Sequence, residues 1–212
     1  MIMRDTKGKE LARLERERGE ALSALLNDLE LTGLGVEVGI YRGVHVVELL
    51  QRWGGHLMGI DPYIPGSYKG LDTSEKTMMQ AFNNTLEYIK EGRFMLSQET
   101  SVEAAARFND KSLDFVYIDA QHDYASVMED IVAWLPKVKN GGLITGHDFV
   151  NWEERDVGVK DAVFDFFRDK GMPLYVMNPH HPMPEWIVKT GFRDVHPTVL
   201  RHAELCEIPP QS

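Results

Sequence analysis

The sequence lacks several features, and each absence narrows what the protein can be. Cys206 is the only cysteine among 212 residues, so an internal disulfide and a cluster of thiolate metal ligands are both excluded. No apolar run approaches the ~18 residues of a membrane-spanning helix. Residues 1–20 are charged throughout, without the apolar centre of a signal peptide. We therefore expect a soluble protein of the reducing cytoplasm that makes no use of a membrane.

Basic residues are also few. The 23 Lys and Arg residues against 33 Asp and Glu residues give a formal net charge of −10 and a pI near 5.3. Because nonspecific nucleic-acid affinity comes mainly from clustered Lys and Arg, we expect no nucleic-acid partner. The composition is otherwise ordinary for a globular protein, with 43% hydrophobic and 26% charged residues. The length suits a single domain over residues 1–212.

Four short segments read as buried strands that run into polar residues. They are VEVGIYRG at 36–43, MGID at 58–61, DFVYIDAQH at 114–122 and GGLITGHD at 141–148. Continuous apolar runs separated by helical stretches are typical of parallel strands covered on both faces. Such sheets bind ligands at the carboxyl ends of their strands. The glycines, acids and histidines therefore all fall on one edge, where we expect the active site.

The remaining patterns complete a fold prediction. Leucines at helical spacing in residues 8–29 predict an amphipathic helix that either covers an edge of the sheet or forms a lid or a contact with a second copy of the chain. Further helices are predicted at 44–53, 77–91, 101–108, 124–135 and 158–170, and strands at 93–96, 173–177 and 186–190, the last two as a hairpin at the sheet edge. The prediction is an α/β, Rossmann-like, doubly wound sheet. It is mostly parallel and seven-stranded with an antiparallel final strand, and it has an N-terminal helical extension (1–30), a catalytic core (31–192) and a C-terminal tail (193–212).

The first strand leads into a turn flanked by Gly39 and Gly43. The pyrophosphate fingerprint G-x-G-x-x-G requires a glycine where this chain has Tyr41, so a dinucleotide would be obstructed. A ligand without phosphates could still lie across the turn. Asp61 ends the second strand about 20 residues further on, the spacing at which an acid meets ribose hydroxyls. We therefore predict a nucleoside-type ligand whose two ribose hydroxyls donate to Asp61.

Together the four segments resemble class I S-adenosylmethionine-dependent methyltransferases. Residues 114–149, DFVYIDAQHDYASVMEDIVAWLPKVKNGGLITGHDF, are similar to the small-molecule O-methyltransferase group that includes macrocin O-methyltransferase and the cephalosporin-hydroxylase-like proteins. The resemblance covers roughly residues 33–189. It implies methyl transfer from S-adenosyl-L-methionine to a small-molecule hydroxyl of the sugar or natural-product type. The first motif departs from the family, with E-x-G-x-x-x-G in place of E-x-G-x-G-x-G.

The resemblance also implies where the cofactor binds. The first motif would border the methionine moiety, Asp61 would hold the ribose, and Thr100 with Ser101 would lie by the adenine. The implied cofactor-binding set is Glu37, Gly39, Ile40, Tyr41, Gly43, Asp61, Thr100, Ser101 and Asp119.

Four polar residues, two at the end of the third segment and two at the end of the fourth, carry the expected chemistry. Carboxylates of this kind suit Mg²⁺ or Mn²⁺, while an imidazole shifts the preference toward transition metals. The resemblance to metal-dependent O-methyltransferases implies Asp119, His147 and Asp148 as metal ligands and His122 as the general base. A bound dication lowers the pKa of a coordinated oxygen, and a His near its ordinary pKa of ~6.5 can then take the proton.

Other interpretations remain open from the sequence. His147 could be bonded to backbone, and His122 could cap the following helix. An NAD(P)-dependent oxidoreductase would also use the glycine turn and Asp61, although Tyr41 and the lack of a Tyr-x-x-x-Lys pair argue against it. A non-catalytic cofactor-binding module is favoured if Asp119, His122 and Asp148 do not converge. A homo-oligomer formed through the N-terminal helix is the partner expected besides the substrate.

Overall fold

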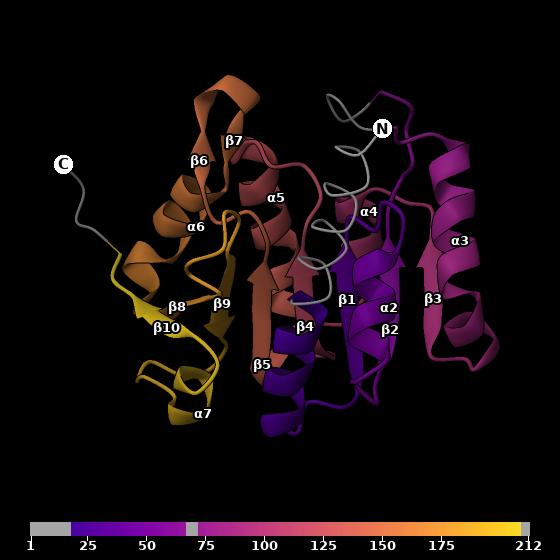
Figure 1. Ribbon diagram of the computed structural model, residues 1–212. Helices are drawn as coiled ribbons and strands as arrows, with labels where there is room; N and C mark the ends of the chain where they lie inside the picture. The colour runs from indigo at the N-terminus through magenta and orange to yellow at the C-terminus, as the bar shows by residue number, and fades with distance from the viewer. Residues whose placement is uncertain (1–17, 67–71, 209–212) are drawn as a thin grey trace, which may run out of the picture.

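The structure is a computed structural model that describes residues 18–66 and 72–208. A central sheet of eight strands has helices on both faces (Figure 1). Strands and helices alternate through most of the chain, as the sequence patterns predict. The predicted Rossmann-like α/β class is therefore confirmed.

The elements follow one another from a helix over residues 18–28. The strands of the main sheet are β1 (Leu34–Val38), β2 (His56–Ile60), β3 (Phe94–Ser97), β4 (Leu113–Ile118), β5 (Val138–Gly146), β8 (Leu174–Met177), β9 (Glu185–Lys189) and β10 (Glu204–Cys206). The helices are α2 (Val44–Leu50), α3 (Glu75–Lys90), α4 (Ser101–Ala105), α5 (Tyr124–Trp134), α6 (Val159–Phe167) and α7 (Pro197–Leu200). The described chain also contains three short 3₁₀ segments, which are η1 (Leu135–Lys137), η2 (Glu153–Arg155) and η3 (Arg168–Lys170). A small separate hairpin is formed by β6 (Asn151–Trp152) and β7 (Val157–Gly158).

The strand order is β10-β8-β9-β5-β4-β1-β2-β3. Strands β1 to β5 pair in parallel, whereas β9 is antiparallel to both β5 and β8. The predicted hairpin of β8 and β9 is present, but β9 lies inside the sheet rather than at its edge. The sheet has one strand more than predicted because β10 pairs with β8. That strand has three residues, none of them buried, so no apolar pattern in the tail predicts it.

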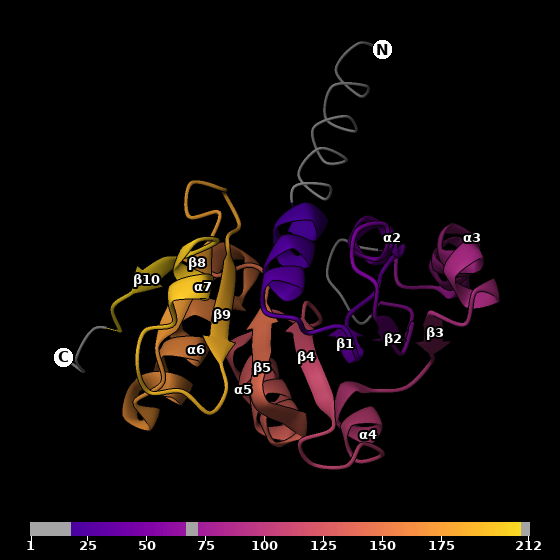
Figure 2. The same ribbon diagram turned by 90° about the horizontal axis from the view of Figure 1, so that it is seen from below.

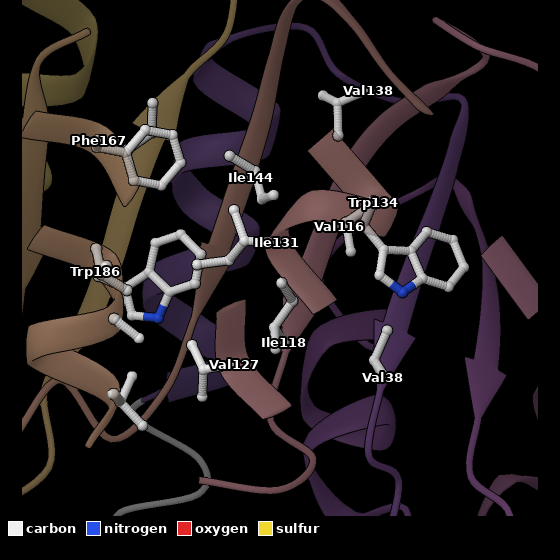
Figure 3. Packing of buried hydrophobic residues seen from close by; sticks show 14 of the residues in the cluster. Val38, Val116, Ile118, Val127, Ile131, Trp134, Val138, Ile144, Phe167 and Trp186 are labelled. Carbon is white, nitrogen blue, oxygen red and sulfur yellow. The ribbon is translucent and has the colours of Figure 1, made fainter. Parts of the chain in front are cut away.

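The helices form two layers (Figures 1 and 2). Helix 18–28, α2 and α3 lie on one face of the sheet, and α4, α5 and α6 lie on the other. On the second face, Trp134 of α5 and Trp186 of β9 are fully buried. Figure 3 shows Trp186 beside Val127 and Ile131 of α5. The apolar face of α5 thus packs against the sheet.

The helix over residues 18–28 covers the first face. Leu22, Leu25 and Leu26 have no exposed surface and belong to one core cluster with residues of α2 and the strands. The described part of the predicted 8–29 helix therefore covers a face of the sheet over its central strands, and not an edge as predicted (Figure 2). Residues 8–17 lie outside the described residues, and contact with a second copy stays a prediction. None of the described helices is both long enough and apolar enough to cross a membrane.

Candidate functional site

The turn after β1 depends on glycine where the chain passes closest to β4. Gly39 has φ 90°, and a Cβ at this position would lie 2.0 Å from the carbonyl oxygen of Asp119. Gly43, with φ 72°, precedes the first residue of α2. Tyr41 between them has φ 49°, a left-handed conformation that is uncommon for a bulky residue. Strained residues of this kind often lie at functional sites.

Asp61, directly after β2, holds this turn in place. Its Oδ2 accepts the backbone N–H groups of Ile40 and Tyr41, both at 3.0 Å, and its Oδ1 accepts the N–H of Tyr63 at 2.9 Å. A carboxylate oxygen has two acceptor positions. With these contacts, Oδ2 is saturated and Oδ1 retains one position. The predicted ribose acid therefore has a structural role that the sequence did not reveal, and its geometry leaves room for one further donor rather than two.

Glu37 lies deeper than the turn. Its side chain is 2% exposed, and its Oε2 is 3.0 Å from Nδ1 of His45. The His45 ring stacks on the Tyr117 ring with centroids 4.5 Å apart. The sequence analysis missed His45, because a histidine on the first turn of an apolar helix carries no signal of its own. Glu37 is therefore part of a buried acid–imidazole pair.

Thr100 and Ser101 open α4, which begins with a capping box formed by Thr100 and Glu103. The Thr100 hydroxyl donates to Glu103 at 2.6 Å. The Ser101 hydroxyl accepts the Trp134 indole N–H at 2.9 Å and hydrogen-bonds to Asp130. Burial raises the pKa of Asp130 to about 6. Both predicted adenine neighbours therefore have hydrogen-bond partners within the protein.

The four polar residues after β4 and β5 converge. Nε2 of His122 lies 3.2 Å from Asp119 Oδ1 and 3.1 Å from Asp148 Oδ2. Nδ1 of His147 lies 3.3 Å from Asp148 Oδ2 and 3.7 Å from Asp119 Oδ1. Parallel pairing of β4 and β5, with Ile118 opposite Gly146, places the residues that follow these strands side by side. Asp148 adopts φ 51°, a second left-handed residue at this edge.

Arg18 reaches the same cluster from the N-terminal helix. Its Nη2 donates to Asp119 Oδ2 at 2.9 Å, and its Nη1 lies 3.3 Å from Nδ1 and 3.5 Å from Nε2 of His147. The residue is 7% exposed. Sequence analysis missed Arg18, which is one of many charged residues in a segment read only for its leucines.

These neighbours shift the pKa values of the cluster. Burial raises the pKa of Asp119, but Arg18, His147 and His122 outweigh it and hold that pKa well below its usual range. Burial lowers the pKa of His122, and the carboxylates of Asp119 and Asp148 more than offset this, so the net shift is upward. For His147, burial and Arg18 lower the pKa while Asp119 and Asp148 raise it, with a net value of about 9. Without a metal, the cluster thus favours charged imidazoles between the two carboxylates.

The cluster can also hold a cation. One potential ligand atom each from Asp119, His122 and Asp148 lies within 4.8 Å of the others. Oδ1 of Asp148 is buried and has no hydrogen-bond partner in the described part of the chain. A buried carboxylate oxygen without a partner is costly unless a cation or a donor reaches it. The donor set therefore fits a divalent metal.

The fold and this edge define a class of protein. A doubly wound sheet with a glycine turn after β1, an acid after β2 and a polar cluster after β4 and β5 is typical of Rossmann-like proteins, which bind ligands at the carboxyl ends of their strands. The methyltransferase domain family matches residues 36–149, more than half of the chain, and the protein belongs to that family. No curated protein sequence matches the chain.

Solved structures share the fold. A proposed O-methyltransferase from Klebsiella pneumoniae is 15% identical, with 82% of this chain and 80% of that chain covered and a TM-score of 0.63. A proposed caffeoyl-CoA O-methyltransferase from Staphylococcus aureus is 16% identical, with 81% and 82% covered and a TM-score of 0.62. A geranyl diphosphate methyltransferase in complex with SAM is 13% identical, with 85% and 86% covered and a TM-score of 0.59. At these identities the likeness establishes the fold.

Proposed function

We propose that the protein transfers the methyl group of S-adenosyl-L-methionine to a hydroxyl group of a small molecule, with the assistance of a divalent metal. The observation that carries the proposal is the convergence of Asp119, His122 and Asp148 beside the glycine turn. Family membership favours methyl transfer over hydride transfer to a nicotinamide. The same convergence argues against a non-catalytic module.

The cofactor would lie across the turn between Gly39 and Gly43. Asp61 fixes this turn through the N–H groups of Ile40 and Tyr41, so the surface under the cofactor is preorganised. The remaining acceptor position on Asp61 Oδ1 would take one ribose hydroxyl. The sulfonium centre would then lie toward Asp119, whose backbone packs against Gly39.

The metal would be held by Asp119, His122 and Asp148. Mg²⁺ binds oxygens at about 2.1 Å in octahedral geometry, which places adjacent ligand atoms about 3 Å apart. The separations of 3.2 Å and 3.1 Å between His122 Nε2 and the two carboxylate oxygens fit adjacent ligands. A bound dication would lower the pKa of an acceptor hydroxyl and so favour its attack on the methyl group. In this proposal His122 is a ligand, whereas the sequence analysis assigned it as the base and His147 as a ligand.

The second candidate keeps His122 as the general base rather than as a metal ligand. Its position between the carboxylates of Asp119 and Asp148 suits a group that accepts a proton, because both carboxylates would stabilise the charged imidazole that results. The two candidates differ in one measurable respect. A ligand contributes to metal affinity, whereas a base contributes to turnover and leaves metal affinity unchanged.

The experiment combines cofactor and metal. Protein purified without added cofactor is denatured, and mass spectrometry of the released small molecules should detect S-adenosylmethionine or S-adenosylhomocysteine rather than NAD. Transfer of tritium from methyl-labelled S-adenosylmethionine is then measured with a panel of catechols, monosaccharides and polyketide alcohols. We expect activity that EDTA abolishes and Mg²⁺ or Mn²⁺ restores. Full activity in EDTA would overturn the proposed metal requirement and leave His122 as the base. Release of NAD would overturn the proposal of methyl transfer.

A further inference from the structure

We propose that Arg18 restricts the metal's ligands to Asp119, His122 and Asp148 by excluding His147. The inference rests on the metal-assisted function proposed above. It concerns a residue of the N-terminal helix, which lies outside the matched methyltransferase domain. Arg18 would be a positioning residue that acts through Asp119 and His147.

The contacts of the guanidinium carry the inference. Arg18 lies within 3.5 Å of both ring nitrogens of His147, so a dication on either nitrogen would face a permanent positive charge at short range. The same guanidinium binds Asp119 through Oδ2. The other oxygen, Oδ1, is the one that lies near His122. Arg18 thus orients Asp119 toward His122 while it blocks His147.

The helix fixes Arg18 in this position. Gly19, the next residue, packs so closely on α2 that a Cβ there would lie 2.6 Å from the Cβ of Glu48. Leu22, one turn further on, is fully buried. The guanidinium carbon also lies 5.8 Å from the centroid of the Tyr117 ring, a distance at which a cation is attracted to the ring face. Packing therefore fixes the helix backbone next to Arg18, and the guanidinium lies against the Tyr117 ring.

Exclusion of His147 has a chemical consequence. Two carboxylates and one imidazole occupy three positions of an octahedral ion, and a fourth protein ligand would leave less of the ion accessible. Catalytic metal sites keep positions open for the reacting molecule. Arg18 would therefore preserve room for the acceptor at the ion.

Mn²⁺ serves as the probe. Its affinity is measured by electron paramagnetic resonance, and the number of coupled imidazole nitrogens by electron spin-echo envelope modulation. Wild type should couple to one imidazole. Arg18→Gln should couple to two and bind Mn²⁺ about 10-fold or more tightly, because a nearby cation is removed and a ligand is gained. Arg18→Lys should behave like wild type, and Arg18→Gln with His147→Ala should return to one imidazole.

A matched control separates this role from helix packing. Arg52→Gln removes the 2.6 Å ion pair between Arg52 and Glu20, which also anchors the N-terminal helix but lies away from the cluster. This variant should retain wild-type Mn²⁺ coupling and affinity. Two coupled imidazoles in wild type, or one in a folded Arg18→Gln variant, would overturn the role proposed for Arg18 and leave the metal site itself unaffected. If wild type fails to bind Mn²⁺ at all, the metal site is wrong and the inference falls with it.

Discussion

The carboxylate of Asp61 accepts the backbone N–H of Tyr41 at 3.0 Å. The acid expected to bind a cofactor ribose therefore also shapes the turn on which that cofactor would rest. Loss of Asp61 would disturb both functions at once. A test of its role in binding must separate a direct hydrogen bond from support of the turn.

Asp61→Ala should weaken S-adenosylhomocysteine binding by about 1.5–3 kcal/mol, the range for a hydrogen bond to a charged group. Calorimetry with the 2′-deoxy and 3′-deoxy analogues completes the test. One analogue, but not both, should bind wild type more weakly, because Asp61 Oδ1 has one acceptor position left. In Asp61→Ala that analogue should show no further loss. Equal losses in wild type and variant would mean that Asp61 acts only through the turn.

Metal affinity should depend on pH. The pKa of His122 is raised in the metal-free protein, and a metal ligand must be deprotonated. Mn²⁺ affinity should therefore fall about 10-fold per pH unit as the pH drops below that pKa. Titrations between pH 6 and pH 9 give the slope. His122→Ala should bind weakly and lose this dependence, and a His122→Ala variant with wild-type affinity would restore the assignment of His122 as base.

Asp148→Asn should lose Mn²⁺ affinity by at least about 100-fold while it keeps S-adenosylhomocysteine binding, since it removes charge from the metal ligands alone. Calorimetry with each ligand in turn measures both effects. His147→Ala should not weaken Mn²⁺ binding, because Arg18 already excludes this imidazole from the metal. A large loss in His147→Ala would support the ligand set that the family resemblance implied.

Asp130 should make stability fall with rising pH. Its folded-state pKa of about 6 lies above the value of 3.8 for an unburied Asp, so folding favours the protonated form. The associated stability is complete below about pH 4 and is lost as the pH rises through 6. Asp130→Asn should therefore match wild type near pH 4 and exceed it by up to about 3 kcal/mol at pH 8. Urea unfolding of both proteins at the two pH values tests this.

Gly39→Ala should destabilise the fold by about 2–5 kcal/mol. The added Cβ would lie 2.0 Å from the carbonyl oxygen of Asp119, and φ is 90°. Gly54→Ala is the matched control, because an added Cβ there would meet no atom beyond its chain neighbours within 4 Å and its φ is outside the positive range. Thermal unfolding of both variants gives the comparison. Similar stability of the two would show that β1 and β4 can separate at this point.

Local sequence patterns were enough to predict the buried strands and the start of one helix. Strands β1, β2, β4 and β5 carry continuous apolar runs, and the Thr100 capping box marks the start of α4. The convergence of Asp119, His122, His147 and Asp148 could also be predicted, because parallel neighbouring strands bring their carboxyl ends together. These predictions needed only periodicity and topology.

Contacts between distant parts of the chain could not be predicted in the same way. Arg18 and Asp119 are 101 residues apart, and nothing in the local sequence distinguishes Arg18 from the other charges around it. The pairing of Asp61 with the turn arises from tertiary geometry and not from spacing alone. For the same reason, β10 was missed, since three unburied residues become a strand only because β8 offers an edge.

Strand β9 lies between β5 and β8, although it follows both in the chain. During translation, β5 is therefore an edge strand of the sheet, with one side unpaired, until residues Glu185–Lys189 have left the ribosome. An unpaired strand edge of this kind tends to pair with other chains. The edge belongs to the strand that precedes His147 and Asp148, so the cluster gains its final support late in synthesis. Truncation before residue 185 should accordingly yield aggregates rather than a smaller active enzyme.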